Sequence, residues 1–202
     1  MFRIISYSKS TDDNSYYIVL DNDGNNVIIK TRSYKVKPMH QKNYIKKVVN
    51  IEGKCDYQEV YNFLVDNYPL FIYYVPSEYL SDSMIDNAIS KEGDVLSILD
   101  KSRRTLNRCR IAVNENGLVY RSVPKEYRSY DLAYSAIKSN PLALRHIEDD
   151  FKSITLCLDA VLGDLRAIKY VPEVFKEKLL IQLYENGLLE SKDVIGELLF
   201  LK

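Results

Sequence analysis

The chain has 202 residues, 46% hydrophobic and 28% charged, and its 28 Lys and Arg side chains balance 28 Asp and Glu. This composition supports one packed domain, or one domain with a small appendage, and argues against a dedicated nucleic-acid binder, which is usually basic. No apolar run approaches the roughly 18 residues of a membrane helix, and polar residues follow the apolar start at once, which predicts a cytoplasmic protein without a signal peptide.

The first fifty residues predict a small β-rich cap. Four segments are rich in β-branched and aromatic residues, at 2–8, 16–20, 27–31 and 34–37. The dipeptide Asp23-Gly24 is typical of a two-residue hairpin turn. We therefore expect an antiparallel β meander over residues 1–50.

From residue 51 to 194 the chain consists of six copies of a 24-residue unit, without insertion or deletion. One column of the repeat holds Ile51, Val75, Leu99, Val123, Ile147 and Val171. Thirteen positions later stand Leu64, Ala88, Ala112, Ala136, Ala160 and Tyr184, each followed by Val65, Ile89, Val113, Ile137, Val161 and Glu185. Such a register is typical of a solenoid, in which each unit buries its apolar face against the next.

Within a unit the periodicity is helical, which predicts a mainly α fold for residues 51–202. Pro76, Pro124 and Pro172 suit the first helical position, and Gly93, Gly117, Gly163 and Gly187 suit helix ends. Asn140-Pro141 predicts a second, shorter helix over residues 142–147. We expect an α-solenoid of about six 24-residue helix-turn-helix units, with Tyr184 and Glu185 marking an atypical terminal unit.

The three cysteines predict neither a disulfide nor a metal site. Cys109 and Cys157 share a column with Ile85, Ala133 and Ile181, so we expect small core side chains in a reducing compartment. The chain has only two histidines, His40 and His146, and no paired cysteines, so no zinc site and no cofactor is predicted.

Charge alternates along the chain in blocks. Residues 1–50 carry nine basic against four acidic side chains, a balance of +5, and residues 51–98 carry two against nine, or −7. Residues 99–146 carry ten against four, or +6, and residues 147–202 seven against eleven, or −4. Stripes of alternating sign can orient a partner, although ordinary surface scatter is the alternative interpretation.

Arginines interrupt two apolar columns of the third unit, at Arg103 and Arg108. Three further arginines lie close by, so the candidate binding residues are Arg103, Arg104, Arg108, Arg110 and Arg121. An unpaired guanidinium in a core is prohibitive, so these side chains are either exposed or paired. One interpretation is a site for an anion or an acidic partner. The other is a helix over 103–113 with the arginines merely solvated and a core face formed by Leu106, Cys109, Ala112 and Val113.

A second basic stretch spans residues 30–47, without any acidic side chain. Its candidate binding residues are Lys35, Lys37, Lys42, Lys46 and Lys47, interleaved with Tyr34 and Tyr44. Contact with a nucleic-acid backbone, with stacking on tyrosine, is one interpretation. A solvated strand edge and helix, on which lysines discourage aggregation, is the other.

Three stretches carry a family resemblance. Residues 136–152, 112–120 and 167–175 resemble a short helical repeat family of unknown function, DUF 4116, whose pattern begins Ala-Val-x-x-Asn-Gly. The resemblance implies a helical repeat and brings no catalytic residues. Such repeats are similar to pieces of bacterial effectors and phage genes, which implies a phage early protein acting in the host cytoplasm.

No P-loop, Rossmann, nucleophile-elbow or zinc-hydrolase pattern occurs, so nothing in the sequence argues for an enzyme. The leading hypothesis is therefore a non-enzymatic protein-binding module that inhibits a host protein, such as a defence enzyme or a toxin, without contact with a membrane. The alternative hypothesis is a nucleic-acid or phosphate-binding protein that uses its basic patches.

Overall fold

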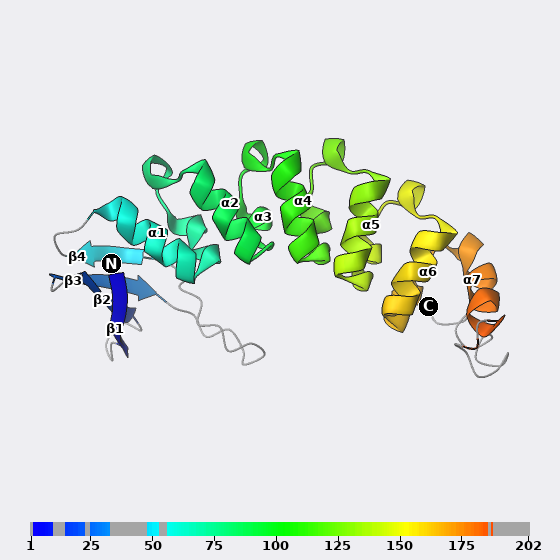
Figure 1. Ribbon diagram of the computed structural model, residues 1–202, viewed down its shortest axis with the longest axis horizontal. Coiled ribbons are helices and arrows are strands. Elements are labelled where there is room, and N and C mark those ends of the chain that lie inside the picture. Colours follow the sequence, from blue (N-terminus) through cyan, green and yellow to red (C-terminus); the bar gives the residue numbers. More distant parts are fainter. Residues whose placement is uncertain are drawn as a thin grey trace. The chain divides into compact units, whose positions relative to one another are not determined.

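The computed structural model describes residues 2–9, 15–22, 25–32, 48–52, 56–185 and 187 (Figure 1). The chain forms two compact units, Met1–Ile98 and Leu99–Lys202, and each is described by itself. The fold is mainly helical with an antiparallel sheet at the N-terminus, which confirms the predicted fold class. The predicted division between residues 50 and 51 falls within the strand Val48–Glu52, and these compact units do not test it.

A four-stranded antiparallel sheet opens the first unit. Its strands, in spatial order, are β1 Phe2–Lys9, β2 Ser15–Asn22, β3 Asn25–Arg32 and β4 Val48–Glu52. Asn22 pairs with Asn25, and the predicted turn Asp23-Gly24 lies outside the described residues. Leu20, Val27 and Ile29 are fully buried whereas Ile28 is 38% exposed, the alternation of a half-buried sheet. The strand expected at 34–37 also lies outside the described residues.

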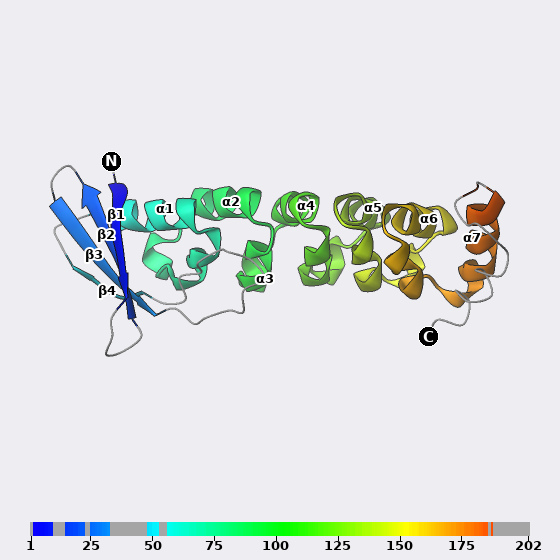
Figure 2. The same ribbon diagram turned by 90° about the horizontal axis from the view of Figure 1, so that it is seen from below.

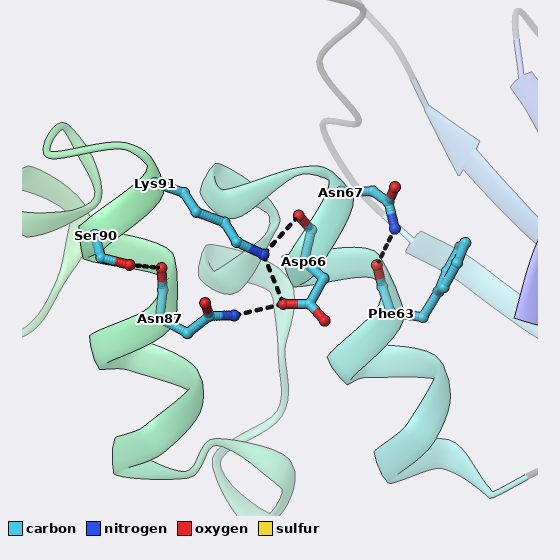
Figure 3. A network of polar contacts seen from close by, with 6 residues as sticks. All are labelled: Phe63, Asp66, Asn67, Asn87, Ser90 and Lys91. Carbon is cyan, nitrogen blue, oxygen red and sulfur yellow. Dashed lines mark hydrogen bonds and ion pairs between the residues drawn. The ribbon is translucent and has the colours of Figure 1, made fainter. Parts of the chain in front are cut away.

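The first unit continues in helices. These are α1 Tyr57–Asn67, the 3₁₀ helices η1 Pro69–Tyr74 and η2 Ser77–Tyr79, α2 Asp82–Lys91 and α3 Val95–Ile98. A polar clamp joins α1 to α2 (Figure 3): the Asp66 carboxylate accepts from Lys91 Nζ at 2.9 Å and from the Asn87 amide. The hydrogen bond from Lys91 is the main cause that lowers the pKa of Asp66. Because both members of this ion pair are exposed, we expect it to fix the register of α1 and α2 more than to stabilise them.

The second unit repeats one pattern at the predicted stride. A one-turn 3₁₀ helix precedes a ten-residue α-helix, which a six-residue 3₁₀ helix follows. The elements are η3 Lys101–Arg103, α4 Leu106–Glu115, η4 Gly117–Ser122, η5 Lys125–Tyr127, α5 Tyr130–Ser139, η6 Pro141–His146, η7 Asp149–Phe151, α6 Ile154–Gly163, η8 Leu165–Tyr170 and α7 Glu173–Glu185. Figures 1 and 2 show α4, α5 and α6 side by side, and each packs on the next.

The prolines do not begin the long helices, in contrast to the prediction. Pro76 and Pro124 cap the one-turn helices η2 and η5, and only Pro172 directly precedes an α-helix. Each ten-residue helix instead begins after a hydroxyl side chain that accepts from the backbone N–H three residues on. These caps are Ser81, Thr105, Ser129 and Ser153, at distances of 3.2, 3.4, 3.3 and 3.1 Å. A side-chain acceptor satisfies an otherwise orphaned N–H, which proline cannot do, and therefore determines the helix start.

The apolar columns of the repeat form the core of each of the two compact units. Ala88, Ala112, Ala136 and Ala160 are fully buried, and the residues after them, Ile89, Val113, Ile137 and Val161, are at most 2% exposed. Tyr184, in the same column, is 37% exposed, which agrees with an atypical last unit. Small side chains at these positions let neighbouring helices approach closely, so the fixed spacing of the repeat translates directly into packing.

Two cysteines belong to this core. Cys109 and Cys157 are free thiols without exposed surface, and burial is the main cause that raises the pKa of each to about 11. We expect both thiols in a Cys55→Ser variant to remain unmodified by a thiol reagent at pH 8 until denaturant is added. The raised pKa keeps the thiols protonated, and burial keeps the reagent away from them. Rapid labelling of the native variant, counted by mass spectrometry, would contradict the buried assignment.

Candidate functional site

Basic side chains of the second unit occupy two distinct positions of the repeat. The first position holds Arg104, Arg128, Lys152 and Lys176, one in each successive copy of the repeat. The first three lie just before the ten-residue helices, and Lys176 lies within α7. The second, the fifth residue of each six-residue 3₁₀ helix, holds Arg121, Arg145 and Lys169. The two sets differ in what their charged groups contact.

Arg104 is bound to the backbone of its own unit. Its Nε and Nη2 donate to the carbonyl of Leu99 at 2.9 and 2.8 Å, and its Nη1 donates to the carbonyl of Ser122 at 2.9 Å. The guanidinium therefore joins the start of α4 to the end of η4, eighteen residues further on. These contacts give Arg104 a structural role.

Arg108 is only 6% exposed and donates from Nη1 to the carbonyl of Arg103 at 3.1 Å. Arg103 itself is half-buried and takes part in interactions of its own. Pairing rather than exposure thus explains how arginine fits at the Arg108 position. Cys109, Ala112 and Val113 are buried as the alternative interpretation of this helix expected, but Leu106 is 36% exposed.

Lys152 and Arg128 repeat the pattern of Arg104. Lys152 Nζ donates to the carbonyl of Tyr170 at 3.1 Å, again eighteen residues on, and pairs with Asp149 at 2.9 Å. Arg128 donates from Nε to the carbonyl of Val123 at 2.9 Å, as Arg104 does to Leu99. Sequence reasoning missed this column, although four basic residues at the repeat spacing were a visible signal.

Glu148 neutralises Arg128. The Glu148 carboxylate pairs with the Arg128 guanidinium and accepts from the Tyr120 hydroxyl at 3.3 Å. Arg128 also lies 5.5 Å from the centre of the Tyr120 ring and donates from Nη2 to the carbonyl of Arg121 at 3.1 Å. Burial, chiefly, raises the pKa of Tyr120 above its usual range, so the phenol stays a hydrogen-bond donor.

The internal role of Arg104 predicts a large loss of stability on truncation. We expect Arg104→Ala to lower the free energy of unfolding by about 3 kcal/mol, because two part-buried carbonyls lose their charged donor. The matched control is Arg110→Ala, an exposed arginine of α4, which should change the free energy of unfolding by less than about 0.5 kcal/mol. Denaturant unfolding followed by circular dichroism measures both, and equal losses would contradict the assigned role.

The second position forms what we call the basic turn stripe, Arg121, Arg145 and Lys169. All three side chains are exposed, and none forms an ion pair within the described part of the chain. Their helices η4, η6 and η8 pack side by side, so the same position recurs on neighbouring turns. Of the candidates predicted from the sequence, Arg121 belongs to this stripe, and Arg145 and Lys169 were missed.

His146 lies beside this stripe. Arg145 Nε donates to His146 Nε2 at 2.8 Å, so this nitrogen acts as an acceptor and the ring is neutral. Partial burial, followed by the charges of Arg145, Arg121 and Arg128, lowers the pKa of His146 below its usual range. The charge of Arg121 on η4 thus helps to lower the pKa of His146 on η6. Positive charges of neighbouring turns therefore lie close together here.

The helical part of the first unit has the opposite character. Residues 56–98 carry eight acidic side chains and one basic one, Lys91, a balance of −7. Tyr73 occupies the same position of the repeat as the basic turn stripe, the fifth residue of a six-residue 3₁₀ helix, and is 65% exposed. Its ring packs edge to face against that of Tyr74, with the ring centres 4.9 Å apart. Other tyrosines, such as Tyr61, are buried in a ring cluster with Phe71.

The remaining candidates lie elsewhere. Lys35, Lys37, Lys42, Lys46 and Lys47 lie outside the described residues, so their role stays a prediction. Among the described residues no three His, Cys, Asp or Glu side chains are grouped to hold a metal ion. No helix in the described ranges combines the length and apolar character that crossing a membrane requires.

Comparisons with protein-family models, with curated proteins and with solved structures find no match to this chain. The resemblance to the DUF 4116 repeat and to phage proteins therefore stays a prediction.

Proposed function

We propose that this chain is a non-enzymatic protein-binding module whose basic turn stripe binds an acidic surface of a partner protein. The observation that carries the proposal is the contrast between two sets of cations in one unit. Arg104, Arg128 and Lys152 are used within the fold, whereas the stripe is exposed and has no acidic neighbour paired with it among the described residues. Like charges held together oppose folding, so their presence is better explained by association than by stability.

The charge distribution favours a protein over a nucleic acid. The chain has no net charge, and residues 56–98 are strongly acidic, so much of its surface would repel a polyphosphate. A folded partner with its own acidic and basic regions can match both signs. Given the phage-like resemblance, we infer a partner in the host cytoplasm, such as a defence enzyme or toxin that the module inhibits.

Charge reversal tests the site. We expect Arg121→Glu, Arg145→Glu and Lys169→Glu together to weaken partner capture from bacterial lysate by at least about 100-fold, since each lost pair contributes about 1–2 kcal/mol. The control reverses three exposed lysines outside the stripe, Lys101, Lys125 and Lys178, with the same change in net charge. Circular dichroism establishes that both variants fold.

The outcomes separate three cases. Capture lost only in the stripe variant supports the assignment. Equal capture by both variants would show that the stripe is not the binding site, and equal loss would show that only overall charge matters.

The alternative function, nucleic-acid or phosphate binding, is favoured by the exposed guanidiniums of Arg121 and Arg145. Retention on heparin and DNA columns tests it. We expect the wild-type chain to elute below about 0.15 M salt, because a neutral chain releases few counterions. Retention above that salt concentration, lost in the stripe variant, would favour the alternative.

A further inference from the structure

We propose that Arg121, Arg145 and His146 form a subsite for a doubly charged phosphate group, carried by a phosphorylated side chain of the partner protein. This inference rests on the proposed function and specifies its ligand chemistry. It comes from how η4 and η6 bring these three side chains together.

Neighbouring elements hold the backbone at these three residues in place. The helices η4 and η6 pack against each other, so the residue at position five of one lies beside that of the other. Arg128 donates to the carbonyl of Arg121 at 3.1 Å and pairs with Glu148, which follows η6. Tyr120 donates to the same carboxylate at 3.3 Å. The backbone on both sides of the subsite is thereby fixed by hydrogen bonds.

Donors remain available on the two arginines. A guanidinium has five N–H groups, one on Nε and four on the two Nη atoms. Arg145 uses Nε for His146 at 2.8 Å, and within the described part of the chain its Nη groups have no partner. The same holds, among the described residues, for the whole guanidinium of Arg121. Paired guanidiniums are well suited to phosphate, which they bind through parallel N–H···O bonds.

Charge matching favours phosphate over carboxylate. Arg128 is neutralised by Glu148 and His146 accepts a hydrogen bond as the neutral ring, so the subsite carries two positive charges, from Arg121 and Arg145. A phosphorylated side chain carries close to two negative charges at pH 7 and would neutralise both. A single carboxylate would leave one of them without a counterion.

Binding of an anion in this subsite should also cause His146 to take up a proton. The charged groups that act on the ring are Arg121 on η4, Arg145 on η6 and Arg128, which pairs with Glu148. Lys169 lies on η8, which packs against η6. Tyr120 and Tyr170 are the titratable neighbours on η4 and η8. Partial burial and then the cations hold the pKa of His146 down, so a dianion that screens the cations should raise this pKa, and affinity should increase as the pH falls.

The two histidines make this measurable. The ring proton of His146 is followed by NMR in the full chain, with His40→Gln used to assign it, during titration with sodium sulfate, a dianion whose charge is constant in this pH range. We expect sulfate to raise the pKa of His146 and to bind more tightly at pH 5.5 than at pH 8. Arg121→Gln should weaken sulfate binding about 10-fold or more, whereas Lys125→Gln should not.

Peptides distinguish the sources of phosphate. A phosphoserine peptide should bind about 10-fold or more tightly than the same peptide with serine, and should produce the same shift of His146. In His146→Asn the fold should persist and the pH dependence of sulfate binding should disappear.

Three results would overturn the inference. These are no response of His146 to sulfate, sulfate binding that Arg121→Gln leaves unchanged, and single-stranded DNA that binds as tightly as the phosphopeptide with the same shift. The last result would replace the phosphoprotein by a nucleic acid. Partner capture through the stripe is measured separately, so loss of the subsite alone leaves the proposed function standing.

Discussion

Replacing Ala136 with aspartate is expected to lower the free energy of unfolding by about 4 kcal/mol, the typical cost of an uncompensated buried charge. Ala136 is fully buried on α5, between residues of the neighbouring helices. A carboxylate there either stays ionised without solvent or takes up a proton, and both options cost free energy. Urea unfolding at pH 7, followed by circular dichroism, measures the loss.

A matched control and a pH series make this prediction specific. Asn114→Asp introduces the same group at an exposed position of α4 and should change stability by less than about 0.5 kcal/mol. Burial raises the pKa of a carboxyl, so the folded Ala136→Asp variant binds its proton more tightly than the unfolded chain does. Its deficit should therefore be largest at neutral pH and shrink as the pH falls. Equal stability of both variants would refute the packing role of the alanine column.

Replacing Gly117 with alanine is expected to cost about 3 kcal/mol, at the upper end of the usual range for overpacking. A Cβ atom at this position would lie 2.1 Å from the carbonyl oxygen of Ala136 and 3.0 Å from the nitrogen of Asn140. Both are backbone atoms of the neighbouring unit of the repeat, so no side-chain rotation relieves the clash. Gly117 N also donates to Ser139 Oγ at 3.0 Å, a bond that any shift would lengthen.

The control for Gly117→Ala is Gly187→Ala. Gly187 has φ of 70° and no heavy atom within 4 Å of an added Cβ, so only the backbone conformation opposes the change, by about 1–2 kcal/mol. Thermal and urea unfolding should therefore rank Gly117→Ala as the more destabilising. The reverse ranking would mean that η4 and α5 separate more easily than this packing implies.

The close approach at Gly117 recurs in the next copy of the repeat, where the larger residue and the glycine have exchanged positions. Pro141 occupies the position equivalent to Gly117 in the next copy of the repeat, and its ring would lie 2.5 Å from a Cβ added to Gly163 at the end of α6. Gly163 in turn occupies the position equivalent to Ser139, the partner of Gly117. A glycine therefore lies on one side of each of these two contacts. Gly117 and Gly163 mark helix ends as the sequence predicted, because α4 ends at Glu115 and α6 ends at Gly163. The structure adds a packing requirement at both glycines.

Helix boundaries show a limit of the sequence reasoning. Proline patterns placed the start of the long helix near residue 124, whereas α5 begins at Tyr130 after the Ser129 cap. Local propensity permits both starts, because Pro124 is equally suited to a one-turn 3₁₀ helix. The hydroxyl column of Ser81, Thr105, Ser129 and Ser153 held the better signal, since a cap specifies one residue.

The sequence by itself determined the stride of the repeat, the helical class and the buried columns of alanine and branched residues, because these depend on side-chain size at fixed spacing. Only the tertiary structure decided which cations are available. Arg104 and Arg121 have the same charge, but the first reaches a carbonyl eighteen residues away and the second faces solvent. That difference depends on how one turn packs on the next. The local sequence does not predict where a backbone carbonyl that needs a hydrogen-bond donor will lie relative to an arginine.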